Sequence, residues 1–184
     1  ALRAAATVTP SARGPLATVS SPTVINDVPI AKVVAISDAA RENVRAIFRR
    51  GQTLGRNPRA FSKVGDSTMV WPAFMAAFDR AVEYALGPFI HLQPTIAYYA
   101  GSFSRQSIAV QVGMHTWTEF DAASVASSQC RAGEGPLACE LRVHNPGIAI
   151  IRLGTNDALD ARSYEASMRR IIEYCRDNGV IPVI

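Results

Sequence analysis

The stretch from residue 147 to residue 184 constrains the fold of this chain more than any other part of the sequence. Residues 147–153 contain an apolar run, residues 160–178 carry apolar side chains at helical spacing, and residues 180–184 are apolar again. A buried strand, an amphipathic helix and a second strand in this order predict parallel strands joined by a helical crossover. Gly179 is placed to end the helix.

The same alternation continues toward the N-terminus. Strands are expected at about residues 60–66, 107–112, 148–153 and 180–184. Helices are expected at residues 38–50, 67–86, 89–99, 116–124 and 160–178, whereas residues 127–145 have the composition of a loop. We therefore predict an α/β fold, a three-layer sandwich around a parallel, flavodoxin-like sheet.

Size and composition fit one domain behind an N-terminal tail. The chain has 184 residues, 48% of them hydrophobic, which is enough to bury a core. Residues 1–23 are rich in Ala, Ser, Thr, Pro and Gly without an apolar period, so they predict a flexible tail or linker before a domain at residues 24–184. No segment approaches the roughly 18 apolar residues of a membrane span, so none is expected.

The charge pattern argues against a nucleic-acid partner. The formal net charge is only +4, and acidic residues interleave with the basic ones. Arg41, Arg45 and Arg49 recur every four residues on the helix face opposite its apolar side chains. We interpret them as a solvated stripe rather than a binding site.

Three of the expected strands end in glycine and polar residues. The first is followed by Gly65-Asp66-Ser67, the second by Gly113, and the third by Gly154-Thr155-Asn156-Asp157. The carboxyl ends of parallel strands share one edge of a sheet, which is where ligands bind in open α/β folds. A purely structural reading is also open: Asp66 or Ser67 can cap a helix, and Gly154 with Asn156 can form an ordinary turn.

Two of these strand ends resemble the SGNH (GDSL-type) hydrolases. Residues 61–67, Phe-Ser-Lys-Val-Gly-Asp-Ser, are similar to the first sequence block of that family. Residues 150–157, Ile-Ile-Arg-Leu-Gly-Thr-Asn-Asp, are similar to its third block, Gly-x-Asn-Asp. The resemblance spans about residues 38–184 and keeps the family's order, although Thr68 stands where the family usually has Leu.

The resemblance implies a serine hydrolase that cleaves an ester, such as an acyl or acetyl ester of a carbohydrate or lipid. Ser67 would be the nucleophile. The backbone N–H groups of Ser67 and Gly113 and the side chain of Asn156 would hold the oxyanion. The family's second block is poorly preserved in residues 110–115, so Gly101 is the alternative to Gly113.

The remaining residues of the two motifs would support this site. Asp66 and Gly154 belong to the motifs themselves, and Asp157 would fix the loop after the third strand by accepting backbone N–H groups. The resemblance implies neither a metal ion nor an organic cofactor.

A serine nucleophile needs a base, and its source is open. The family takes its histidine from an Asp-x-x-His segment after the last strand, a pattern that this sequence lacks. Of the histidines present, His91, His115 and His144, His115 can approach the site because it follows Gly113 by two residues, although a surface or pocket-lining role is the alternative.

We therefore expect the family's last strand, last helix and histidine segment to lie beyond this chain. They would belong to a C-terminal continuation or to a companion chain next to Ile184. The alternative function is a non-catalytic extracellular domain, or an assembly subunit, on an SGNH-like scaffold.

The cysteines predict one crosslink and one free thiol. Cys130 and Cys139 bracket a loop with Gly and Pro, which a disulfide closes easily, and their spacing does not suit a zinc site. Cys175 lies on the apolar face of its helix and is predicted to be a buried free thiol. A disulfide implies an oxidising compartment, so we expect a secreted or extracellular protein.

Overall fold

The computed structural model describes residues 23–25, 28–29, 35–70, 74–158 and 161–184, so nearly all of the expected tail at residues 1–23 lies outside the described residues. The strands are β1 (Val24–Ile25), β2 (Val28–Pro29), β3 (Asn57–Gly65), β4 (Pro146–Arg152) and β5 (Ile181–Val183). The α-helices are α2 (Asp38–Thr53), α3 (Ser67–Val70), α4 (Gln93–Tyr98), α5 (Pro136–His144) and α6 (Ala161–Asp177). Short 3-10 helices lie at Ala76–Asp79, Gly87–Leu92, Trp117–Phe120, Ala122–Ser124 and Thr155–Asp157.

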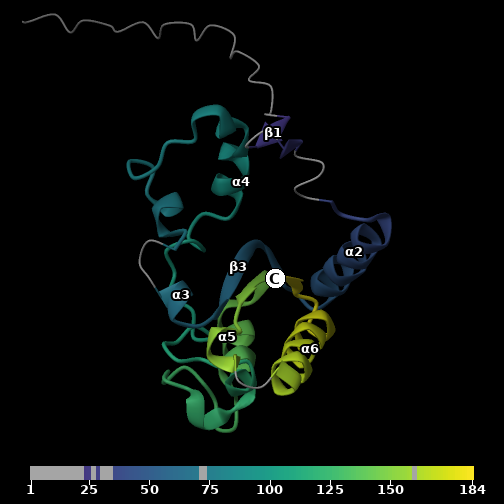
Figure 1. The fold of residues 1–184 in the computed structure, drawn as a ribbon, viewed down its shortest axis with the longest axis vertical. Coiled ribbons are helices and arrows are strands. Elements are labelled where there is room, and N and C mark those ends of the chain that lie inside the picture. Colours follow the sequence, from purple (N-terminus) through teal and green to yellow (C-terminus); the bar gives the residue numbers. More distant parts are fainter. Residues whose placement is uncertain (1–22, 26–27, 30–34, 71–73, 159–160) are drawn as a thin grey trace, which may run out of the picture.

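A small open sheet of three parallel strands, in the order β3-β4-β5, lies near the middle of the molecule (Figure 1). Gly65 at the end of β3 pairs with Arg152 at the end of β4, and Ile150 of β4 pairs with Val183 of β5. The strands run in the same direction, so their carboxyl ends share one edge. This confirms the parallel α/β arrangement and the strands expected near residues 60–66, 148–153 and 180–184.

The fourth expected strand, at residues 107–112, is reduced to a single parallel bridge between Val110 and Gly65. Backbone N–H groups that a longer strand pairing would use donate to side chains instead. The N–H of Ile108 donates to the Glu140 carboxylate, and the N–H of Ala109 donates to the Ser107 hydroxyl. The expectation of a strand here was wrong because these side-chain acceptors compete with the neighbouring strand.

Alternate residues of β3 enter two different hydrophobic clusters, as the two-residue period of a strand requires. Val64 packs into the larger cluster, which includes Leu137 and Leu141 of α5 and Ile171 of α6. The smaller cluster includes Phe61, Ile96 and Phe103, with Phe61 and Phe103 in edge-to-face contact at 5.0 Å between ring centroids. The two clusters hold β3 on both faces, and its carboxyl end projects beyond them.

The long helix expected at residues 67–86 is absent from the described part of that segment. α3 covers only Ser67–Val70, and after the undescribed residues 71–73 the chain makes a 3-10 helix at Ala76–Asp79. Met75 has a left-handed backbone with φ +60°, which no α-helix accommodates. The Asp79 carboxylate accepts N–H groups from Gly101 and Ser104, so distant contacts shape this segment.

Other local expectations are partly corrected. Residues 127–145, expected as a loop, contain α5, which begins at Pro136 after the N-cap Gly135. Proline suits this first helical position because its missing N–H has no helical partner there. The helix expected at residues 89–99 is present as the end of a 3-10 helix followed by α4, whereas the one expected at residues 116–124 is replaced by two short 3-10 helices.

Helix α6 confirms its prediction, and α2 does so with a difference in packing. Met168, Ile171 and Cys175 of α6 are buried. In α2 the Ser37 hydroxyl caps the first turn by accepting the N–H of Ala40. The arginine stripe of α2 is exposed as expected, but Val44 and Phe48 on its apolar side remain 40% and 43% exposed.

No helix among the described residues is long and apolar enough to cross a membrane.

Candidate active site at the carboxyl ends of β3 and β4

Ser67 stands at the first turn after β3 and is exposed. The turn leaves no room for a side chain at residue 65. A Cβ on Gly65 would lie 2.8 Å from the carbonyl oxygen of Arg152 and would also collide with the Met69 sulfur. The buried Asp66 carboxylate accepts the N–H and hydroxyl of Thr68 at 2.8 and 2.7 Å. Asp66 thereby caps α3, which leaves the Ser67 hydroxyl without a hydrogen-bond partner among the described residues.

The loops that follow Val110 and β4 meet each other at the same edge. The Asn156 side-chain amide donates to the carbonyl oxygen of Met114 at 2.8 Å. Val110 pairs with Gly65 on one side of β3, and Arg152 of β4 pairs with Gly65 on the other. Two loops that start on opposite sides of β3 are therefore joined at the edge where β3 ends.

A buried carboxylate makes the second link between these loops. Asp157, 8% exposed, accepts the N–H of Thr116 at 3.1 Å and its hydroxyl at 2.8 Å. Asp157 thus binds the loop after Gly113. From the sequence we expected it to fix the loop after β4, in which it lies. The His115 ring lies beside it, with Nδ1 3.8 Å from Asp157 Oδ1, and stacks on Trp117.

The three groups expected to bind an oxyanion are placed as follows. Ser67 begins α3, Gly113 is exposed with φ +77°, and Asn156 is half-buried. An amide has two N–H donors, so Asn156 retains a second one beside the bond to Met114. The alternative, Gly101, donates its N–H to Asp79 at 2.7 Å, so this donor is already used.

The other two histidines are held elsewhere. His144 ends α5, before the start of β4, and its Nε2 lies 3.6 Å from the Glu140 carboxylate. His91 lies in the 3-10 helix Gly87–Leu92, with a buried Nδ1 that has no partner among the described residues.

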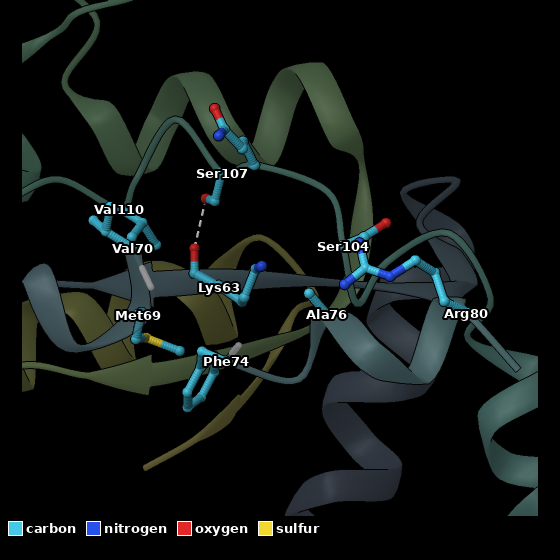
Figure 2. Close-up of a pocket in the computed structure, with 10 residues that line it drawn as sticks. Lys63, Met69, Val70, Phe74, Ala76, Arg80, Ser104, Ser107 and Val110 are labelled. Atoms are coloured by element: carbon cyan, nitrogen blue, oxygen red, sulfur yellow. Dashed lines mark hydrogen bonds between the residues drawn. The ribbon is translucent and has the colours of Figure 1, made fainter. Parts of the chain in front are cut away.

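A pocket of about 220 Å³ opens beside α3, next to Ser67 in the chain. Its apolar part is formed by Met69, Val70, Phe74, Ala76 and Val110. Its polar part is formed by Lys63, Arg80, Ser104, Gln106 and Ser107. Figure 2 shows the Lys63 side chain reaching into the space below Ser107, with Met69 and Phe74 on one side and Ser104 and Arg80 on the other.

From the sequence, Lys63 was named only as part of the motif at residues 61–67, and its position in this pocket was not predicted. The side chain is 7% exposed, and its amine donates to the carbonyl oxygen of Phe103 at 3.1 Å. Burial, together with the nearby Arg105 guanidinium, lowers the pKa of the amine. The available signal was a lysine between the apolar residues Phe61 and Val64 of an expected strand.

The predicted disulfide between Cys130 and Cys139 is confirmed, with the sulfurs 1.98 Å apart. The same sulfurs and Glu134 form a group that could otherwise hold a metal ion, but the sulfurs are bonded to each other and Glu134 forms an ion pair with Arg142. Cys175 is a buried free thiol, as predicted, and burial raises its pKa to about 12.

No family model, curated protein or solved structure matches this chain.

Proposed function

We propose that this protein is a serine hydrolase of the SGNH type that cleaves an ester of a carbohydrate or a lipid. The observation that carries the proposal is the joining of the loops after Val110 and after β4 at the edge where β3 ends, two residues before the exposed Ser67. The proposal includes the family's three-layer, flavodoxin-like sandwich, which the parallel sheet supports. It also includes a secreted or extracellular location, in keeping with the disulfide.

In the proposed reaction the Ser67 hydroxyl attacks the ester carbonyl. Its proton passes to a base, and the N–H groups of Ser67, Gly113 and Asn156 stabilise the tetrahedral oxyanion. The carbon–oxygen bond to the alcohol breaks, and the base returns the proton to the leaving alcohol. Water then hydrolyses the acyl-enzyme by the same route and releases the acid.

Among the histidines of this chain, His115 is the candidate base. It follows Gly113 by two residues and lies beside the buried Asp157 carboxylate, which can orient the ring and stabilise its protonated form. A base from outside this chain is the competing source, and the two make different predictions for a His115→Ala variant.

A fluorophosphonate probe with peptide mapping tests the nucleophile. We expect labelling at Ser67, abolished in Ser67→Ala and unchanged in Ser128→Ala, an exposed serine in the loop before α5. His115→Ala is expected to slow both labelling and hydrolysis of short 4-nitrophenyl esters about 10²–10⁴-fold if His115 is the base.

Unchanged rates in His115→Ala would place the base outside residues 1–184. Labelling that persists in Ser67→Ala would reject this nucleophile. A complete lack of labelling and hydrolysis would favour the alternative, a non-catalytic domain on the same scaffold.

A further inference from the structure

The pocket beside α3 joins a cationic side to an apolar side. Lys63 and Arg80 supply positive charge, and none of its described lining residues is acidic, although Arg80 forms an exposed ion pair with Glu83 outside the lining. Met69, Val70, Phe74 and Val110 supply an apolar wall. A volume of about 220 Å³ equals that of about seven water molecules in the liquid, which is enough for a short acyl chain with a terminal carboxylate.

Lys63 is a buried cation whose donors are mostly unused. An ammonium group has three N–H donors, and the described contacts use one of them, on the carbonyl oxygen of Phe103. No described carboxylate lies within ion-pair distance of the Lys63 amine. A buried cation without an ion-pair partner is costly, so an anion that enters the pocket gains a strong partner.

The carboxylates nearest to this lysine already have other partners. Asp79 accepts N–H groups from Gly101 and Ser104, and its second oxygen also accepts the Ser104 hydroxyl. Glu140 pairs with Arg105 at 2.8 Å. Neither acid is therefore available to neutralise a ligand-free Lys63 by a direct contact.

The pocket adjoins the proposed nucleophile through two segments of the chain. Met69 and Val70 follow Ser67 within α3. Val110 pairs with Gly65, two residues before Ser67. Ser67 itself does not line the pocket, so the acyl part of an ester attacked by Ser67 would pass Met69 and Val70 before it reached Lys63.

From this arrangement we propose that the pocket binds the free carboxylate of a dicarboxylic half-ester. Lys63 holds the carboxylate, Arg80 adds positive charge beside its exposed pair with Glu83, and the apolar wall packs against the methylene groups between the carboxylate and the scissile carbonyl. This names the substrate class and rests on the proposed function. Anion binding in the pocket can nevertheless be measured without catalysis.

Binding of glutarate and of butyramide, which lacks a carboxylate, followed by NMR titration, tests the pocket directly. We expect glutarate to bind wild-type protein and Ser67→Ala alike, and at least about tenfold more tightly than butyramide. Lys63→Met, which keeps the aliphatic stem, is expected to remove this preference. Arg80→Met removes the second cation of the pocket together with its exposed ion pair to Glu83, and should weaken glutarate binding severalfold. Arg45→Met on the exposed face of α2 is the charge-matched control and should change nothing.

Hydrolysis of 4-nitrophenyl glutarate and 4-nitrophenyl butyrate separates this proposal from the proposed function. A higher kcat/KM for the glutarate ester, lost in Arg80→Met, supports both. Selective glutarate binding without hydrolysis would support the pocket and reject the hydrolase. Hydrolysis without preference for glutarate, or binding of inorganic phosphate as tight as that of glutarate, would overturn the pocket's assignment to a dicarboxylic acyl chain.

Discussion

At the scale of single residues, the burial of Glu119 links the stability of this protein to pH. It is fully buried, and neither carboxylate oxygen has a hydrogen-bond partner among the described residues. Burial, with the nearby Glu140, raises its pKa well above the ordinary value. The group therefore keeps its proton in the folded protein at a pH where the unfolded chain has released it.

This difference predicts a stability that falls as pH rises. Folded Glu119 binds a proton that the unfolded chain loses above its ordinary pKa of 4.5, so the free energy of unfolding decreases with pH from there until the raised pKa is reached. Glu119→Gln removes this ionisation. Relative to wild type, the variant should gain more than about 1 kcal/mol between pH 5 and pH 7.

Urea unfolding across that pH range measures the effect. Only the change with pH tests the prediction, because a buried amide adds a constant offset. Glu165→Gln, at an exposed ion pair on α6, is the control and should follow the wild-type pH dependence. Parallel curves for Glu119→Gln and wild type would contradict the prediction.

At the scale of elements, the disulfide connects the loop after the 3-10 helices to α5. Cys130 lies in that loop and Cys139 in the first turns of α5, nine residues apart in sequence. Glu134 inside the closed loop forms an ion pair with Arg142 of α5, and this arginine, with the N–H of Arg131, lowers the pKa of Glu134 to about 2. The loop is thus held to the helix by one covalent and one ionic link.

Removing the disulfide should loosen α5 without abolishing the fold. In the chain-entropy model a loop of this length contributes about 2–3 kcal/mol, so Cys130→Ser/Cys139→Ser should unfold at correspondingly lower urea concentration. Chemical denaturation of the oxidised wild type and the double variant measures the difference. Addition of a reductant should destabilise the wild type and leave the variant unchanged, and equal midpoints before reduction would reject the prediction.

At the scale of the whole molecule, Arg56 ties together three segments that are distant in sequence. It precedes β3, and its guanidinium donates to the carbonyl oxygen of Leu141 in α5 and to Asn145 before β4. It also donates to the backbone and side-chain oxygens of Asn178 after α6. A half-buried cation therefore connects three segments at the amino-terminal end of the sheet.

We expect Arg56→Met to lower the free energy of unfolding by about 2–4 kcal/mol, because several partly buried oxygens lose a charged donor. Thermal and urea unfolding provide the measurement. Arg169→Met is the matched control, since its exposed pair with Glu165 should contribute no more than about 0.5 kcal/mol. Similar losses in both variants would show that Arg56 is an ordinary surface arginine.

Local sequence patterns were sufficient for features that depend on one segment at a time. The apolar period determined α6 and its buried Met168, and the apolar runs determined β4 and β5. The glycine and polar residues that follow the expected strands predicted that the chain turns at one edge of a parallel sheet. Cysteine spacing predicted the disulfide. Each of these signals lies within a few residues, so no distant partner was needed to interpret it.

Only the tertiary structure decided the features for which distant groups compete. Glu140 captures the N–H of Ile108 and so reduces the strand expected at residues 107–112 to one bridge. The contacts of Asp79 with Gly101 and Ser104 hold residues 76–79 apart from the long helix that their apolar spacing suggested. The link between Asn156 and Met114, like the placement of Lys63 in a pocket, joins residues about forty positions apart in the chain. A sequence pattern records which face of an element is apolar, but which buried polar group finds which partner depends on where the folded chain brings them together.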